Sequence, residues 1–233
     1  MSVFHFKQFS IEQNLCAMKV GTDGVLLGSW TNVPDGNVLD IGSGSGLISL
    51  MIAQRNSKCN IDAIDIDEGA FMQTKLNIEK NNKSNFIRPL HTPLQGFKNP
   101  KNYNLIVSNP PFFSNCLKSN NTAKNTARHT DTLSFDDLLY SVSDLLSPEG
   151  IFSVILPVVS AKEFIESAKT YRLNINRVCE VKPNYSTPPK RSLMEFSFKN
   201  CKPKLNLLTI ETNQRHEYTE EYKLLTQNFY LKF

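Results

Sequence analysis

The sequence predicts an α/β fold with one mostly parallel sheet of seven strands, helices on both faces and an antiparallel pair of strands at one edge. Short runs of β-branched residues alternate with segments of helical periodicity through most of the chain, which is typical of βαβ units. Near the C-terminus, two alternating segments are joined by a proline-rich connection, which indicates the antiparallel pair. With 233 residues, of which 40% are hydrophobic, the chain is long enough to bury the core of one such domain.

The first half of the chain contains six of the expected elements. They are, in order, strand 37–41, helix 47–55, strand 61–66, helix 68–80, strand 86–90 and strand 103–108. The strands are short runs rich in Val, Ile and Leu, as strands buried in a parallel sheet are. In the second helix, Phe71, Leu76 and Ile78 supply the expected apolar positions.

The second half resumes this alternation after a polar stretch over residues 114–132. The expected elements are helix 135–146, strand 151–156, helix 161–171, strands 174–181 and 192–198, strand 205–210 and helix 219–226. Ser134 is the expected N-cap of the first of these helices, and the Pro-Glu-Gly sequence at 148–150 ends it. The two strands around the connection 182–191 form the antiparallel pair.

Composition and charge limit the class of protein. The 26 Lys and Arg exceed the 22 Asp and Glu, and the resulting net charge of +4 is compatible with an anionic partner such as RNA. The sequence has no basic leader before an apolar run and no apolar stretch of about 18 residues, so we expect a cytoplasmic protein without a membrane segment. Its five Cys and four His lack the spacing of a zinc site, and we expect reduced thiols and no metal.

The sharpest local pattern is a glycine turn between the first strand and the helix that follows it. Gly42, Gly44 and Gly46 alternate there, and glycine permits both a tight turn and the close approach of a ligand to the backbone. A turn that serves packing alone is the alternative interpretation. A dinucleotide site requires G-x-G-x-x-G, but its third glycine position is Leu47, which argues against a dehydrogenase.

This D-x-G-x-G-x-G turn resembles the S-adenosylmethionine site of class I methyltransferases. The resemblance implies that the glycines form an uncharged floor under the cofactor. Asp65, at the end of the next strand, is then expected to accept hydrogen bonds from the ribose hydroxyls. Asp67 is a weaker candidate, because it could simply begin the following helix. Asp40 is expected to meet the ammonium end of the methionine moiety, directly or through water.

A second motif, Asn-Pro-Pro-Phe at 109–112, directly follows the strand 103–108, at the carboxyl edge where such sheets bind ligands. This form occurs in methyltransferases that act on planar amino groups such as adenine N6. The Asn109 side-chain carbonyl and the Pro110 backbone carbonyl can accept the two N–H bonds of such an amine. Pro111 stiffens the loop, and Phe112 offers a face on which the base can stack. A simple end to the strand is the alternative.

The segment 16–28 is, by spacing alone, a loop that leads into a helix capped by Thr22 or Asp23. Residues 19–30 contain the motif K-V-G-T-D-G-V-L-L-G-S-W. Together with the two motifs, with residues 188–191 and with residues 218–222, it resembles the bacterial tRNA(Val) adenine N6-methyltransferases, which modify the adenosine beside the anticodon. The resemblance implies methyl transfer from S-adenosylmethionine to N6 of adenosine 37 of tRNA(Val). Lys19 and Thr22 would help to close the cofactor pocket. Residues 1–34 are then an N-terminal extension, and residues 35–233 form the methyltransferase domain.

The sequence departs from this family at one contact. Members usually place an acidic residue after the third strand to hold the cofactor adenine, but here the stretch is His-Thr-Pro-Leu-Gln at 91–95. A backbone amide near Leu94 or the Thr92 hydroxyl could replace it. We expect looser cofactor binding, to be checked by calorimetry against relatives that have the acidic residue.

Basic residues near the expected active site suggest how RNA is bound. Lys124 and Arg128 in the polar stretch, with Lys190 and Arg191, could form a track for phosphates, although an ordinary solvated loop explains the polar stretch equally well. Other planar amines, guanine N2 of ribosomal RNA or a protein glutamine amide, remain alternative substrates. An RNA-binding protein that has lost turnover is the non-enzymatic alternative. A monomer is the favoured oligomeric state.

Overall fold

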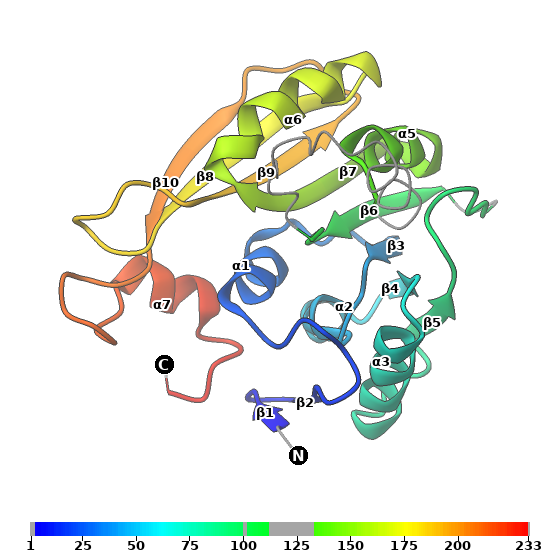
Figure 1. Cartoon of the computed structure of the whole chain (residues 1–233), viewed down its shortest axis with the longest axis horizontal. Helices are drawn as coiled ribbons and strands as arrows, with labels where there is room; N and C mark the ends of the chain where they lie inside the picture. Colours follow the sequence, from blue (N-terminus) through cyan, green and yellow to red (C-terminus); the bar gives the residue numbers. More distant parts are fainter. Residues whose placement is uncertain (1–2, 100–101, 112–132, 233) are drawn as a thin grey trace, which may run out of the picture.

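The computed structural model describes residues 3–99, 102–111 and 133–232. Its main feature is an eight-stranded sheet with the strand order β10-β8-β9-β7-β6-β3-β4-β5 (Figure 1). The strands are β3 (Gly36–Ile41), β4 (Cys59–Asp65), β5 (Ile87–His91), β6 (Tyr103–Ser108), β7 (Leu146–Pro157), β8 (Asn174–Lys182), β9 (Arg191–Ser197) and β10 (Lys204–Thr209). Of these eight, only β9 runs against the others.

Helices cover both faces of the sheet and enclose two apolar cores (Figure 1). One face carries α1 (Thr22–Trp30), α2 (Leu47–Arg55), α3 (Glu68–Lys80) and α7 (Glu220–Thr226). The other face carries α5 (Phe135–Leu145) and α6 (Val158–Thr170). The strands are apolar on both sides: along β3, Val38 belongs to the first core and Leu39 to the second. This two-sided burial explains the continuous apolar runs of the sequence.

The expected α/β fold is confirmed, and the strand expected at 205–210 joins the expected seven-stranded sheet as an eighth strand, β10. β8 and β9 do pair antiparallel, but β10 adds to the free side of β8 in parallel and becomes the edge. A separate two-stranded sheet, β1 (Val3–His5) and β2 (Ser10–Glu12), was not expected. Its three-residue strands are too short for a pattern of alternation to reveal them.

Several boundaries differ from the sequence-based expectations for local reasons. Ser134 caps α5 as expected, but the helix ends at Leu145 and β7 begins at once, so residues 148–150 lie in an irregularity of β7 opposite β6. α1 starts at Thr22 with Gly21 as its N-cap, and neither Thr22 nor Asp23 caps it. The Asp23 carboxylate instead accepts a hydrogen bond from Arg191 Nε at 2.9 Å.

The buried face of α3 is more polar than expected. Ile78 is buried in the first core as expected, but its buried neighbours on the helix are mostly polar. Leu76 is 41% exposed, whereas Gln73, Thr74 and Asn77 are buried. These side chains find hydrogen-bond partners in the N-terminal segment and in the glycine turn, so that they can be buried without penalty.

The parallel strands β3, β4 and β6 end at one edge of the sheet. β3 lies between β4 and β6 in the sheet. The chain first forms β4 on one side of β3 and later forms β6 on the other side. In open α/β sheets, ligands bind at such a switch point, outside the carboxyl ends of the strands. The register places Ile41 beside both Ile64 and Ser108, and this brings the segments that follow the three strands together.

Candidate functional site

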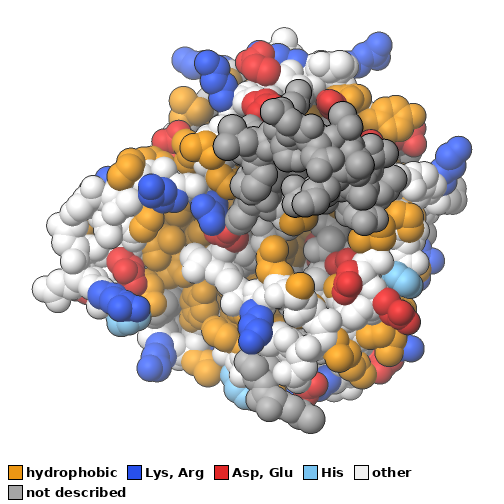
Figure 2. Space-filling model, in the orientation of Figure 1, with side chains coloured by type: hydrophobic (Ala, Val, Ile, Leu, Met, Phe, Trp, Pro, Cys, Tyr) orange, Lys and Arg blue, Asp and Glu red, His pale blue; other side chains and the backbone are white. Residues whose placement is uncertain are grey.

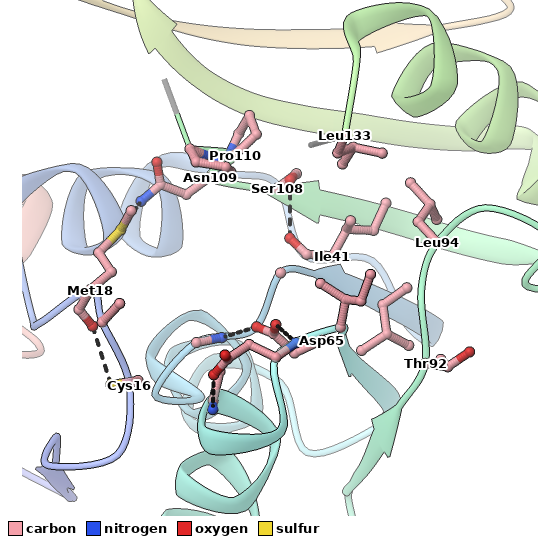
Figure 3. A pocket seen from close by; sticks show the side chains of 18 of the residues that line it. Cys16, Met18, Ile41, Asp65, Thr92, Leu94, Ser108, Asn109, Pro110 and Leu133 are labelled. Carbon is pink, nitrogen blue, oxygen red and sulfur yellow. Dashed lines mark hydrogen bonds between the residues drawn. The ribbon is translucent and has the colours of Figure 1, made fainter. Parts of the chain in front are cut away.

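A cavity of about 310 Å³ opens at the carboxyl ends of β3, β4 and β6 (Figure 3). Most of its wall comes from five parts of the chain: residues 16–18, the glycine turn, residues 64–67, Thr92 with Leu94 and Gln95, and residues 108–111. Ala70 and Leu133 also line it. Asp65 lies on one side of the cavity, with Asn109 and Pro110 on the opposite side. The structure therefore brings together the glycine turn, the acidic strand end and the Asn-Pro-Pro motif, which the sequence separates by more than 60 residues.

The three glycines of the turn have different surroundings. All three adopt the left-handed backbone conformation, with φ of +71° at Gly42, +60° at Gly44 and +78° at Gly46, which L-residues rarely adopt. Gly42 and Gly44 line the cavity. A Cβ on Gly42 would meet open space, and one on Gly44 would lie 4.0 Å from Gly42 O. Gly46 does not line it, and a Cβ there would lie 3.3 Å from Cγ2 of Thr74. The absence of side chains at the first two glycines thus leaves space in the cavity. The third glycine instead allows α2 to pack closely against α3.

Asp65 holds its carboxylate at the cavity wall. Its Oδ2 accepts a hydrogen bond from Gly44 N at 2.9 Å, and its Oδ1 accepts one from Asp67 N at 3.0 Å. Each oxygen keeps a further lone pair, as a contact with two hydroxyl groups requires. Asp67 also lines the cavity, but its side chain caps α3 by accepting a hydrogen bond from Ala70 N at 2.7 Å. The alternative interpretation of Asp67 as the beginning of a helix is therefore confirmed.

Asp40 is fully buried and lies outside the residues that line the cavity. Its Oδ2 accepts hydrogen bonds from the backbone N and the hydroxyl of Ser49, at 3.1 and 2.7 Å. Its Oδ1 has no hydrogen-bond partner among the residues that the structure describes. Burial raises the pKa of Asp40 to about 6, and the hydrogen bonds from Ser49 oppose this rise. The side chain is thus a buried acceptor with one unused oxygen.

The Asn-Pro-Pro motif begins directly after β6. Ser108 fixes the strand end by donating its hydroxyl to Ile41 O at 3.0 Å. Asn109 and Pro110 then line the cavity, and the Asn109 amide nitrogen lies 3.9 Å from the sulfur of Met18. Asn109 Oδ1 is buried and has no hydrogen-bond partner within the described part of the chain. An acceptor at the cavity is therefore free for a donor. Phe112 lies outside the described residues.

The N-terminal segment contributes three residues to which the sequence-based reasoning gave no role in the site. Cys16, Ala17 and Met18 line the cavity, whereas Lys19 and Thr22 do not. The Cys16 thiol donates to Met18 O at 3.2 Å, and burial raises its pKa, so it is held as a neutral thiol. No local sequence motif predicts that these three residues line the cavity, because their position depends on how the segment packs across α3.

The stretch that lacks the acidic residue does reach the cavity. Thr92, Leu94 and Gln95 line it. The Thr92 backbone N donates to Asp65 O at 3.0 Å, and its hydroxyl lies 3.3 Å from Pro93 O. Leu94 is buried and contributes an apolar wall, and Gln95 is a polar lining residue to which the sequence-based reasoning gave no role.

The expected phosphate contacts are described only in part. Lys190 is exposed, and Arg191 is paired with Asp23 while a third of its side chain stays exposed. Lys124 and Arg128 lie outside the described residues. Basic side chains are scattered over the face shown in Figure 2 and do not form one continuous patch among the residues described there.

The described residues show neither a cluster of metal ligands nor a membrane-spanning helix. They contain no group of three or more His, Cys, Asp or Glu side chains that could hold a metal ion. None of their helices is long and apolar enough to cross a membrane.

The chain is similar to a known protein family and to individual proteins of known name. The family model for the Methyltransferase small domain matches residues 18–135. The tRNA1(Val) (adenine(37)-N6)-methyltransferases of Parabacteroides distasonis and Trichodesmium erythraeum are 45% and 46% identical to the chain. These alignments cover 98% and 99% of the chain and 98% of each relative.

Solved structures resemble the fold at much lower identity. A predicted O-methyltransferase from Agrobacterium tumefaciens superimposes with a TM-score of 0.68 at 16% identity, over 89% of this chain and 96% of that one. A putative RNA methyltransferase from Pyrococcus horikoshii gives a TM-score of 0.55 at 12% identity, over 74% and 79% of the two chains. At such identities, the likeness is evidence for the fold alone.

Proposed function

The chain belongs to the tRNA1(Val) (adenine(37)-N6)-methyltransferase family and has the class I methyltransferase fold, and from this premise we propose that it methylates N6 of adenosine 37 in a tRNA(Val). The methyl donor in this proposal is S-adenosylmethionine, and the place of action is the cytoplasm. One observation carries the proposal: the glycine turn, Asp65 and Asn109 surround a single cavity.

The residues around the cavity fit S-adenosylmethionine. Gly42 and Gly44 leave space for the cofactor at the bottom of the cavity. S-adenosylmethionine has no phosphate group, so the site needs no Lys or Arg to bind one. The Asp65 carboxylate suits the ribose hydroxyls, and the side chains of Ile64 and Leu94 form apolar walls suited to an adenine ring. When bound, S-adenosylmethionine supplies a sulfonium methyl group and leaves as a neutral thioether.

Asp40 and Gly46 act from outside the cavity lining in this proposal. Asp40 offers its unused Oδ1 toward the ammonium group through a bridging water, since its side chain does not reach the cavity surface. Gly46 allows α2 to start at the turn with its backbone N–H groups near the cofactor.

Asn109 and Pro110 hold the substrate amine in this proposal. The lone pair of an exocyclic amine is delocalised into the ring, so the amine becomes a good nucleophile only when its hydrogens are turned out of the ring plane. The free Oδ1 of Asn109 and the Pro110 carbonyl oxygen accept hydrogen bonds from the two N–H groups of this amine. Pro111 limits the motion of the loop, and Phe112 stacks on the base. Alignment of the amine with the methyl group then supplies most of the rate.

The N-terminal residues 1–34 close the cofactor pocket in this proposal, and residues 35–233 form the methyltransferase domain. Cys16, Ala17 and Met18 support this role because they already form one wall of the cavity. Lys19 and Thr22 would act beside this wall. α1 itself is built into the first core through Val25–Leu27, so the closing part is the segment before it.

The tRNA backbone is bound by what we call the phosphate track, which consists of Lys124, Arg128, Lys190 and Arg191. Arg191 begins β9, the strand that starts where the other strands of the sheet end, so Lys190 and Arg191 lie at the edge of the sheet that carries the cavity. Positive charge at this edge supports binding of an anionic polymer.

The proposal is tested by incubating the protein and S-adenosylmethionine with total tRNA from a strain that lacks it, followed by nucleoside analysis. We expect N6-methyladenosine in tRNA(Val). The Asn109→Ala variant should bind cofactor normally but methylate at least about a hundredfold more slowly, a loss of about 3 kcal/mol of transition-state stabilisation. The control is Asn206→Ala on the exposed edge of β10, which should keep full activity. Methylated guanine, or no methylated nucleoside, would overturn the proposal.

A further inference from the structure

Three amide side chains form a row on one face of α3. Gln73, Asn77 and Asn81 are four residues apart, which places them one above the other along the helix and its C-cap. Gln73 and Asn77 are 1% and 0% exposed, and Asn81 is partly buried. Burial of an amide is costly unless its hydrogen-bonding groups are used, so this row requires partners.

The partners are backbone groups of residues 10–18, a segment that we call the strap. Asn81 exchanges two hydrogen bonds with the backbone of Ser10, at 2.9 and 2.8 Å. Asn77 does the same with Glu12, at 2.9 and 2.8 Å. Gln73 Oε1 accepts from the backbone N of Asn14 and of Leu15, at 2.8 and 3.0 Å. We call these three contacts the amide ladder.

The ladder works because two periodicities nearly agree. Four residues of an α-helix rise about 6 Å, and two residues of an extended chain span about 6.6 Å. Amides at every fourth residue of α3 therefore meet every second residue of the strap. The side chains of α3 act as a neighbouring strand would, although the strap lies against a helix.

The last contact of the ladder adjoins the cavity. Gln73 binds Asn14 and Leu15, and the next three residues of the strap line the cavity. The strap also passes close to the first turn of α3, where a Cβ on Gly69 would lie 2.4 Å from Leu15 O. By contrast, Asn81 binds Ser10, six residues before the cavity wall begins.

The same face of α3 also holds the glycine turn. Asn77 Nδ2 donates to Ser45 O at 2.8 Å, and the Thr74 hydroxyl donates to Gly44 O at 3.0 Å. One helix face therefore holds two segments that contribute to the cavity wall, the strap and the glycine turn. The distance between the strap and the glycine turn is therefore set by α3, to which both segments are bound.

We propose that Gln73 is a positioning residue for the cofactor, which holds the strap at the distance from the glycine turn that the bound cofactor requires. This inference rests on the proposed function. Gln73 touches neither cofactor nor substrate in this proposal and acts through residues 14–18. Asn81 belongs to the same ladder but serves the fold, because its contact is remote from the cavity.

The test compares Gln73→Met with Asn81→Leu in the full chain. Each change removes one amide of the ladder, and Asn81→Leu is the matched control for lost stability. Binding of S-adenosylhomocysteine is measured by calorimetry, and unfolding by urea. We expect the dissociation constant to rise about tenfold for Gln73→Met and less than about twofold for Asn81→Leu, with similar losses of stability. Gln73→Glu keeps oxygen acceptors for both backbone N–H groups and should restore most of the affinity.

Hydrogen exchange gives a second measurement. Exchange at Asn14 and Leu15 should become faster in Gln73→Met and return toward the parent rate in Gln73→Glu. Equal affinity in Gln73→Met and the parent would overturn the inference, as would equal losses of affinity in Gln73→Met and Asn81→Leu. A parent protein that fails to bind S-adenosylhomocysteine would instead overturn the proposed function, and the inference with it.

Discussion

Replacing Asp40 by Asn should change stability and cofactor binding in opposite directions. Asp40 is fully buried, Ser49 donates two hydrogen bonds to its Oδ2, and its Oδ1 has no partner in the described part of the chain. Burial raises its pKa from the usual 3.8 to about 6. The folded chain therefore binds the Asp40 proton more tightly than the unfolded chain. The stability that this proton contributes is fully present below about pH 4 and is lost as pH rises through about 6.

The magnitude follows from these values. A rise from 3.8 to about 6, at about 1.4 kcal/mol for each pKa unit, means that the ionised carboxylate costs about 3 kcal/mol at pH 7.5. Asn removes this cost but places an amide NH2 where Oδ1 has no donor or acceptor beside it, which costs about 1–3 kcal/mol. We expect a gain of about 0–2 kcal/mol in the free energy of unfolding at pH 7.5. At pH 5 the parent Asp40 is mostly protonated, so the variant's advantage should fall by about 1.4 kcal/mol.

Urea unfolding of parent and Asp40→Asn at pH 7.5, 6 and 5 measures this difference, with the exposed Asp144→Asn as control. Cofactor affinity should fall about tenfold at pH 7.5, because the charge offered to the ammonium group is lost. A stability difference between variant and parent that stays constant from pH 7.5 to pH 5 would refute the reasoning about the buried carboxylate. Unchanged affinity would refute the role of Asp40 toward the cofactor and leave the stability argument intact.

Three further predictions concern the cavity and the RNA. Gly44→Ala and Gly46→Ala should each lose about 1–2 kcal/mol of stability because both positions have positive φ, but calorimetry should show weaker cofactor binding only for Gly44→Ala, whose methyl group enters the cavity. Asp65→Ala should lose at least about tenfold in affinity, whereas Asp67→Ala should lose about 1 kcal/mol of stability with the α3 cap and keep its affinity; the reverse pattern would exchange their roles. Neutralising the phosphate track should weaken tRNA binding and lower its salt slope by about 0.7–0.9 per contact, and an unchanged slope would exclude the track.

Most of the fold was predictable because each element carries its own signal. Apolar β-branched runs indicated the strands from Gly36 to Ser197, and Ser134 marked the start of α5 by the same hydrogen bond that the structure contains. The elements that were missed depend on partners elsewhere. β1 and β2 have three residues each and depend on pairing with each other and on the contact of β2 with α3. The burial of Gln73 and Asn77 on α3 was not predictable from the local pattern, because their partners lie about 60 residues away.

The sequence by itself determined the chemistry of the site. The glycines at 42, 44 and 46, the aspartate after the next strand and the Asn-Pro-Pro motif are local patterns, since each depends on a turn or a strand end that neighbouring residues specify. Only the tertiary structure decided which groups face one another. It turned Asp40 toward Ser49, used Asp67 as a helix cap and brought Cys16–Met18 to the cavity wall. The physical reason is that a buried polar group must satisfy its hydrogen bonds, and which partner lies within reach depends on how distant segments pack.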